Sequence, residues 1–220
     1  RTLVRAFLDT LPEAKRPWVR INGLDTGHTL ADLAAVVGGR PGGVMLPKVR
    51  SRADLERLDN YLSALETASG IPDGSTRVIT VATETPDGMF AIGTYRGVPR
   101  LDAMTWGAED IATAIGALDN RDEHGEYEHF YQMARSLCLA GAAAAGVVPI
   151  ETIHGNFRDP EGLKRTATMA RRAGFRGMLA IHPDQVETIN RAFTPTEEEV
   201  VRARQIVDLL AASPGVGAFG

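Results

Sequence analysis

Several features that would place this chain in a broad class are missing from it. Among its 220 residues there is a single cysteine, Cys138, so a disulfide framework is excluded. That cysteine lies in an alanine-rich stretch, where apolar neighbours favour a small core residue over a reactive thiol. No apolar run approaches the ~20 residues of a membrane span. We therefore expect a cytoplasmic protein that has no membrane contact.

An excess of positive charge is missing as well. Lys and Arg number 24 against 28 Asp and Glu, which gives a net charge of -4. This balance offers no electrostatic basis for binding nucleic acid or an anionic membrane. With 44% hydrophobic and 24% charged residues, the composition is that of an ordinary globular protein.

Most of the common cofactor and nucleophile motifs are also absent. The sequence has no Walker A motif, no zinc-ligand spacing and no Gly-x-Ser-x-Gly elbow. The segment Gly215-Val-Gly-Ala-Phe-Gly220 matches Gly-x-Gly-x-x-Gly. It follows a predicted helix, whereas the dinucleotide-binding fingerprint follows a strand, so we discard it.

What is present is a regular alternation of apolar strands and amphipathic helices. The predicted strands are residues 18–21, 43–46, 77–82, 102–106, 147–152 and 178–181. The predicted helices are residues 2–11, 29–37, 51–69, 88–95, 111–117, 130–146, 161–173, 183–192 and 195–212. Strands that are mostly apolar throughout indicate a parallel sheet covered by helices. Two architectures fit: an open doubly wound sheet, or a (β/α)₈ TIM barrel, which needs two more strands and has room for them upstream of Arg1.

Two carboxylates stand where neighbouring strands are predicted to end. Glu84 lies in Val81-Ala-Thr-Glu-Thr-Pro-Asp-Gly88, and Asp110 closes Met104-Thr-Trp-Gly-Ala-Glu-Asp110. Ends of adjacent strands are separated by about 4.8 Å, which is close enough for both groups to share a hard divalent cation. Alternatively, both residues are helix N-caps.

Other strand ends carry charged or ligating residues too: Arg20, Lys48, Glu151 with His154, and His182. Arg20 suits bidentate binding of a substrate carboxylate, with a structural ion pair as the alternative. Lys48 is a candidate site-lining residue, and a Schiff-base role is a weaker alternative. His182 is either a hydrogen-bonded structural residue or part of the site. In both candidate folds, functional groups gather at the carboxyl ends of strands.

Five motifs, taken in order, resemble the citrate lyase β-subunit-like branch of the HpcH/HpaI aldolase family. They are Val19-Arg-Ile-Asn22, Val44-Met-Leu-Pro-Lys-Val49, Ala82-Thr-Glu-Thr-Pro86, Trp106-Gly-Ala-Glu-Asp110 and Ala180-Ile-His-Pro-Asp-Gln-Val186 with Asn190. The resemblance covers essentially the whole chain. It implies a TIM barrel assembled into homotrimers or hexamers, with this chain, residues 1–220, forming a single barrel domain that spans about strands three to eight.

The resemblance also implies roles for individual residues. Glu84 and Asp110 match the Mg²⁺ ligands, with Mn²⁺ as a substitute, and Arg20 matches the arginine that holds the substrate carboxylate. Gly107 and Ala108 match the segment that offers amide N–H groups to a 2-oxoacid, and Lys48 matches a pocket lysine. The family's first two strands would precede Arg1, and its C-terminal lid segment, which carries a catalytic Asp, would follow Gly220.

The expected function is a Mg²⁺-dependent carbon–carbon lyase. It would cleave or form a 3-hydroxyacyl-CoA such as citryl-CoA or malyl-CoA, with a 2-oxoacid and an acyl-CoA as the other reactants. Two alternatives are a CoA-independent 2-oxoacid aldolase and a non-catalytic assembly subunit of a lyase complex.

Overall fold

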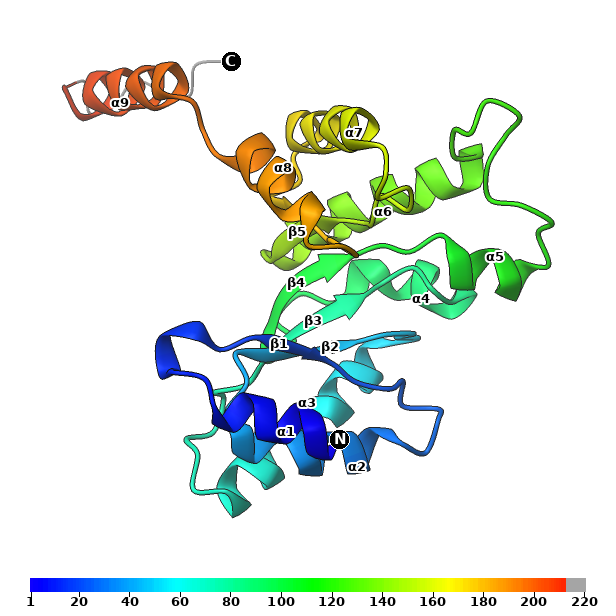
Figure 1. Cartoon of the computed structure of the whole chain (residues 1–220), viewed down its shortest axis with the longest axis vertical. Coiled ribbons are helices and arrows are strands. Elements are labelled where there is room, and N and C mark those ends of the chain that lie inside the picture. The colour runs from blue at the N-terminus through cyan, green and yellow to red at the C-terminus, as the bar shows by residue number, and fades with distance from the viewer. Residues whose placement is uncertain (213–220) are drawn as a thin grey trace.

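The computed structural model describes residues 1–212, apart from the side chain of Glu13, as an α/β fold (Figure 1). Its strands are β1 (Trp18–Arg20), β2 (Gly43–Leu46), β3 (Arg77–Val81), β4 (Leu101–Thr105), β5 (Val148–Glu151) and β6 (Gly177–Met178). Its helices are α1 (Thr2–Asp9), α2 (Thr29–Val36), α3 (Arg52–Ala68), α4 (Pro86–Ala91), α5 (Glu109–Ile115), α6 (His129–Ala145), α7 (Pro160–Ala173), α8 (Asp184–Phe193) and α9 (Glu197–Ala212). Short 3₁₀ turns are η1 (Glu13–Lys15), η2 (Val37–Gly39) and η3 (Ile92–Thr94).

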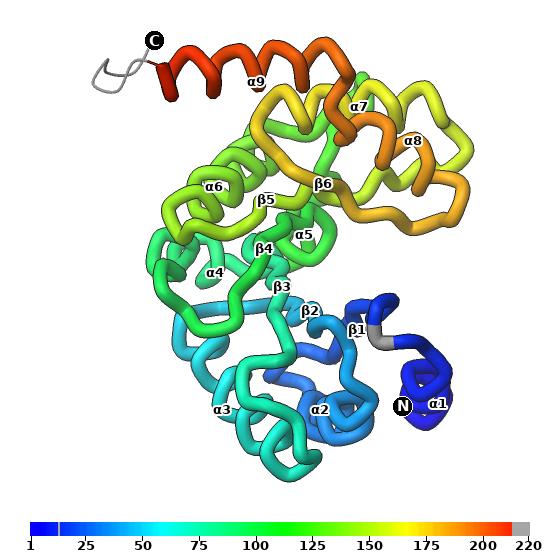
Figure 2. Tube along the Cα trace, turned by 90° about the vertical axis from the view of Figure 1, so that its left-hand side faces the viewer, coloured from blue at the N-terminus to red at the C-terminus, as the bar shows by residue number. Residues whose placement is uncertain are grey.

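The strands form one sheet in the order β1-β2-β3-β4-β5-β6, and every neighbouring pair is parallel. A doubly wound sheet reverses its strand order at a switch point, and this sheet does not. The sheet instead curls, with the helices on its outside, as half of a barrel does (Figure 2). The expected α/β fold with a parallel sheet is therefore confirmed, with six strands in a curled half-barrel, and the open doubly wound alternative is wrong.

The core lies between the central strands and the helices that cover them. In β3 only Arg77 is exposed, and β2 and β4 are buried almost throughout. Leu55, Leu58 and Leu62 recur at helical spacing on α3, and each is at most 2% exposed. This packing fixes the strands rigidly, and with them the loops that leave their carboxyl ends.

The last strand is shorter than expected. Residues 178–181 were predicted to be extended, but β6 ends at Met178. The N–H of Leu179 still donates to the carbonyl oxygen of Glu151, whereas the N–H of Ile181 donates to Gln185 Oε1. The side chain of Gln185 therefore replaces the sheet as the partner of the backbone, and the strand turns away.

Helix ends follow local capping chemistry. Thr196 and Glu199 form a reciprocal capping box at the start of α9. Gly174 ends α7 with a φ of +113°, a conformation that L-residues avoid. Thr85 is the N-cap of α4, and its Oγ1 accepts the N–H of Gly88, while Asp87 lies inside the first turn.

Helix α9 extends away from the rest of the chain (Figure 1). None of its residues is buried, and an ion pair between Arg171 and Glu199 ties its first turn to α7. The discarded glycine motif at 215–220 lies outside the described residues. Within residues 1–212, no helix is both long and apolar enough to cross a membrane.

Candidate metal and substrate site

Strands β3 and β4 bring the two predicted carboxylates together at the carboxyl ends of the parallel strands. Val81 pairs with Thr105 at the end of the ladder, and the Ala82 N–H donates to the Thr105 carbonyl oxygen at 2.8 Å. Glu84 follows three residues after Val81, and Asp110 lies in the first turn of α5, just beyond β4. Both side chains therefore belong to the loops at the carboxyl ends of adjacent strands.

Glu84 is a buried acid whose pKa is raised. It is 8% exposed, and its Oε2 accepts the backbone N–H of Lys48 at 2.7 Å. Burial raises the pKa of Glu84, and the negative charge of Asp110 adds to this rise. The Lys48 hydrogen bond and the positive charges of Arg20 and Lys48 oppose it. The other three charged site residues, Arg20, Lys48 and Asp110, thus lie within electrostatic range of Glu84.

Lys48 connects the two acids. Its backbone φ is +56°, a left-handed conformation that costs energy for a non-glycine residue and is typical of functional sites. In this conformation its N–H meets Glu84, while its Nζ lies 3.1 Å from Asp110 Oδ1. A lysine held in an ion pair is not the desolvated amine that Schiff-base chemistry uses, so the site-lining role is favoured.

The donor set fits a hard divalent cation. Among the described residues, no group of three or more His, Cys, Asp or Glu side chains could enclose a metal ion. Mg²⁺ does not require such a cage, since it binds through one or two carboxylates and keeps its remaining ligands as water or substrate. The Asp110 side chain is 38% exposed, which leaves room for those ligands. The Lys48 ammonium beside Asp110 shows that the pair attracts positive charge.

Gly107 lies against Glu84. A Cβ at this position would be 3.3 Å from Glu84 Cγ, closer than most side chains tolerate. The Gly107 N–H donates to Thr83 Oγ1 at 2.9 Å, and the Thr83 hydroxyl donates back to the Gly107 carbonyl oxygen at 3.0 Å. The Gly107 N–H therefore has Thr83 Oγ1 as its partner in this structure. For both Gly107 and the buried Ala108, an amide contact with the substrate stays a prediction.

Arg20 is the last residue of β1 and is exposed. Its positive charge lowers the pKa of Glu84, so Arg20 lies within electrostatic range of that carboxylate. Among the described residues, none forms an ion pair with Arg20, which weakens the structural alternative. Glu109, next to Asp110, is bound by Asn120 Nδ2 at 2.7 Å. Of these two adjacent acids, Asp110 is therefore the candidate ligand, because its ion-pair partner among the described residues is the site residue Lys48.

The remaining strand-end residues make structural contacts. Glu151 is 2% exposed and binds Arg135 at 2.7 Å, Trp106 Nε1, and the N–H of Thr152 at 3.0 Å. His182 stacks on Phe157 at 4.7 Å between ring centroids.

His154 also lies at the end of β5. Burial lowers its pKa, and its Nε2 has no hydrogen-bond partner among the described residues. Neither His154 nor His182 contacts the carboxylate pair.

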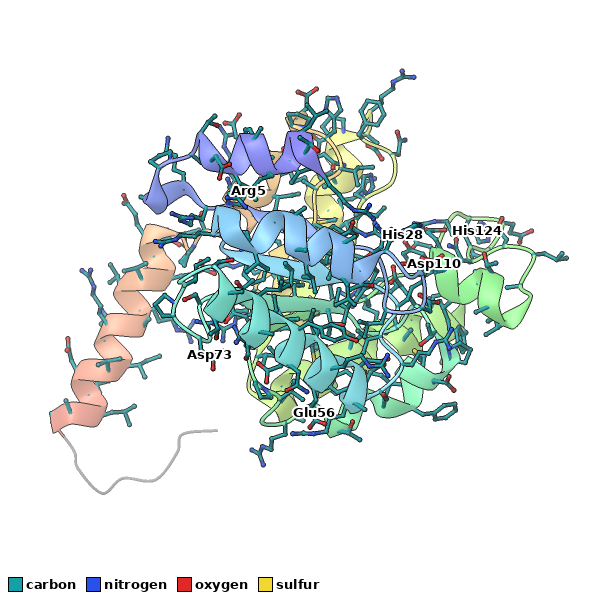
Figure 3. All side chains as sticks on the ribbon, turned by 90° about the horizontal axis from the view of Figure 1, so that it is seen from below. Arg5, His28, Glu56, Asp73, Asp110 and His124 are labelled. Carbon is teal, nitrogen blue, oxygen red and sulfur yellow. The ribbon has the colours of Figure 1, made fainter. Side chains whose placement is uncertain are left out.

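A second cluster of charges lies at the amino ends of β3 and β4, away from the candidate site. Arg100 pairs with Asp59, with Glu66 at 2.8 Å, and with Asp73. Figure 3 shows Asp73 and Asp110 at opposite sides of the molecule. This cluster therefore fastens α3 to the amino ends of β3 and β4 and takes no part in the candidate site.

Sequence reasoning missed Thr83 and the contacts of Glu151 with Arg135 and Trp106. A threonine inside an apolar strand end is a weak signal, because β-branched residues are common in strands. The partners of Glu151 come from β4 and α6, so no local spacing connects them.

Residues 1–183 match the model of the HpcH/HpaI aldolase/citrate lyase family. An L-malyl-CoA/beta-methylmalyl-CoA lyase of Cereibacter sphaeroides is 31% identical over 218 residues, covering 90% of this chain and 67% of that protein. A (3S)-malyl-CoA thioesterase of the same species is 33% identical over 208 residues, covering 94% and 67%.

Among solved structures, protein CitE from Mycobacterium tuberculosis, in complex with magnesium, acetoacetate and coenzyme A, superimposes with a TM-score of 0.76. It is 29% identical, and the match covers 98% of this chain and 75% of that one. Together with the family match over residues 1–183, these similarities agree with the motifs quoted above. The chain belongs to the HpcH/HpaI aldolase/citrate lyase family.

Proposed function

We propose that this chain is a Mg²⁺-dependent carbon–carbon lyase that cleaves or forms a 3-hydroxyacyl-CoA such as malyl-CoA or citryl-CoA. The products of cleavage are a 2-oxoacid and an acyl-CoA. The observation that carries the proposal is the pairing of Glu84 and Asp110 on adjacent strand ends, with Lys48 between them. The relatives named above support the choice of a CoA thioester as substrate.

The chain's own residues supply most of what this reaction needs. Glu84 and Asp110 would hold the Mg²⁺, which when bound acts as a Lewis acid toward the oxygens of the 2-oxoacid portion. Arg20 binds and orients the carboxylate of that portion through its guanidinium fork. Lys48 would be displaced from Asp110 by a bound cation, and its ammonium would then be available to the substrate. Ala108 contributes a backbone amide at the start of α5.

We propose that the six strands of the half-barrel correspond to strands three to eight of a complete TIM barrel. In this proposal, residues 1–220 are one barrel domain, completed by two further strands and by a C-terminal segment that covers the site. We also propose that the working form is a homotrimer or hexamer. Size-exclusion chromatography with light scattering tests that assembly.

A thioesterase is the second candidate, because a (3S)-malyl-CoA thioesterase is as similar to this chain as the lyase is. Thioester hydrolysis would use the same carboxylate pair but break the C–S bond instead of the C–C bond. The CoA-independent aldolase and the non-catalytic subunit make further, distinct predictions: cleavage of free hydroxyacids, and no turnover at all.

One assay with two detectors separates the lyase from the thioesterase. The protein is incubated with Mg²⁺ and, in separate reactions, with malyl-CoA and citryl-CoA; the 2-oxoacid is trapped with phenylhydrazine, and free thiol is titrated in parallel. The lyase produces 2-oxoacid without free thiol. Free thiol without 2-oxoacid would identify a thioesterase and contradict the lyase proposal, and the absence of both products would contradict both.

A further inference from the structure

We propose that Thr83 is a positioning residue for the carboxylate pair: its buried hydroxyl fastens the loop after β3 to the loop after β4 and so sets the separation of Glu84 and Asp110. This inference rests on the proposed metal-dependent function. Thr83 touches neither the proposed metal nor the substrate. It acts through Gly107 and through its neighbour Glu84.

The hydroxyl of Thr83 continues the sheet beyond its last backbone rung. The ladder between the two strands ends where the Ala82 N–H donates to the Thr105 carbonyl oxygen. The next N–H in line, just beyond the end of β4, is that of Gly107, and it donates to Thr83 Oγ1 at 2.9 Å. The same hydroxyl donates to the Gly107 carbonyl oxygen at 3.0 Å. A single side chain therefore satisfies both polar groups of one residue on the neighbouring loop.

Both carboxylates lie immediately beside this connection. Glu84 is the next residue after Thr83, and Asp110 is three residues after Gly107, in the first turn of α5. Gly107 also packs against the side chain of Glu84: a Cβ at position 107 would lie only 3.3 Å from Glu84 Cγ. A shift of the Gly107 loop therefore moves Asp110 and changes the packing of Glu84 at the same time.

Burial makes the connection difficult to replace. Thr83 is 0% exposed, so water cannot take over the hydrogen bonds of its hydroxyl. Removing the hydroxyl leaves the N–H and carbonyl of Gly107 without that partner, and the loop must rearrange to satisfy them. A metal site that takes one carboxylate from each loop depends on the spacing of the two loops. Mutation of residues that orient the metal ligands typically lowers metal affinity by about 10–100-fold.

The test is Mg²⁺ affinity, measured by calorimetry on the full chain. Thr83→Val keeps the shape of the side chain and removes both hydrogen bonds, and we expect its affinity to fall about tenfold or more. Thr83→Ser keeps the hydroxyl and should bind Mg²⁺ within a few-fold of the unchanged protein. If Thr83→Val does not fold, Thr83→Cys serves instead, because a thiol forms only weak hydrogen bonds; its Mg²⁺ affinity should be clearly lower than that of Thr83→Ser.

Thr105 offers a matched control. It is 0% exposed on the adjacent strand, and its Oγ1 has no hydrogen-bond partner among the described residues. Thr105→Val therefore makes the same chemical change without removing a bond, and Mg²⁺ affinity should not change.

The failures of the two proposals are distinguishable. If Glu84→Gln abolishes Mg²⁺ binding while Thr83→Val or Thr83→Cys binds normally and only melts earlier, Thr83 is structural and the positioning role is wrong. The lyase proposal then stands. If the unchanged protein shows no Mg²⁺ binding that depends on Glu84, the positioning role and the proposed metal site are both wrong.

Discussion

The Nζ atom of Lys48 lies 3.1 Å from Oδ1 of Asp110, so a lysine at the end of β2 already balances the charge of an acid at the start of α5. Both side chains are roughly 40% exposed, and such pairs contribute at most about 1 kcal/mol to stability. The value of the contact therefore lies in the site rather than in the fold: the ammonium and a divalent cation compete for the same carboxylate.

Lys48→Met should bind Mg²⁺ several-fold more tightly than the unchanged protein, because the competing positive charge is gone. Its free energy of unfolding should change by less than about 1 kcal/mol. Calorimetric titration with MgCl₂ measures the affinity, and Lys164→Met, at an exposed position on α7, is the control. Weaker binding in Lys48→Met would mean that the lysine supports the metal site instead of competing for it.

Glu84 should make the metal-free protein less stable as the pH rises. Because burial raises its pKa in the folded state, folded chains keep this proton to a higher pH than unfolded chains do. Its contribution to stability is therefore highest below the ordinary pKa of a glutamate and is lost as the pH rises through the raised pKa.

Glu84→Gln should remove that loss, so at pH 7 without metal the variant should melt at a higher temperature than the unchanged protein. The expected rise is roughly 2–4 °C for each kcal/mol gained in the free energy of unfolding. Denaturation curves between pH 4 and about pH 8 measure the effect, and Glu126→Gln, at an exposed position, is the control. Adding Mg²⁺ should raise the melting temperature of the unchanged protein alone. A difference between the two proteins that does not vary with pH would contradict this account of Glu84.

Arg20→Lys should lose activity although it keeps its charge. A lysine cannot reproduce the two parallel hydrogen bonds that a guanidinium makes to a carboxylate. The loss of about 2–5 kcal/mol corresponds to a rate roughly 30 to several thousand times lower. Lyase rate and melting temperature are measured together. An early-melting variant with near-normal turnover would place Arg20 in the scaffold.

Arg135→Met should destabilise the fold. It leaves Glu151 buried at 2% exposure without its positive partner, at a cost of roughly 3 kcal/mol. Urea denaturation measures this cost. Arg191→Met is the control, because its ion pair with Glu187 is 80% and 76% exposed and should contribute little. Equal stability in the two variants would show that Glu151 does not need Arg135.

The sequence was sufficient to predict the parallel sheet, because apolar stretches such as residues 77–82 are characteristic of strands buried on both faces. It also placed Glu84 and Asp110 at one sheet edge, because carboxyl ends of parallel strands coincide. The curl of the sheet and the sequential strand order required coordinates, since the same pattern fits an open sheet. The partners of Glu151 were out of reach for another reason: tertiary contacts between β5, β4 and α6 leave no local pattern.

The hydrogen bonds between Thr83 and Gly107 could not be predicted from the sequence either. The family resemblance assigned the Gly107 amide to the substrate, but side-chain hydrogen bonding between loops depends on register. The register of β3 and β4 shifts between Val78 and Ile79, and a sequence pattern does not reveal such a shift.

Calorimetric titration of Mg²⁺ into four proteins tests the central claim most directly: the unchanged chain, Glu84→Gln, Asp110→Asn and Glu109→Gln. Glu109 is the matched control, because it is adjacent to Asp110 but is bound by Asn120. The account predicts one binding site in the unchanged chain and in Glu109→Gln, and weak or no binding in the other two variants. Undiminished binding in both Glu84→Gln and Asp110→Asn would contradict it.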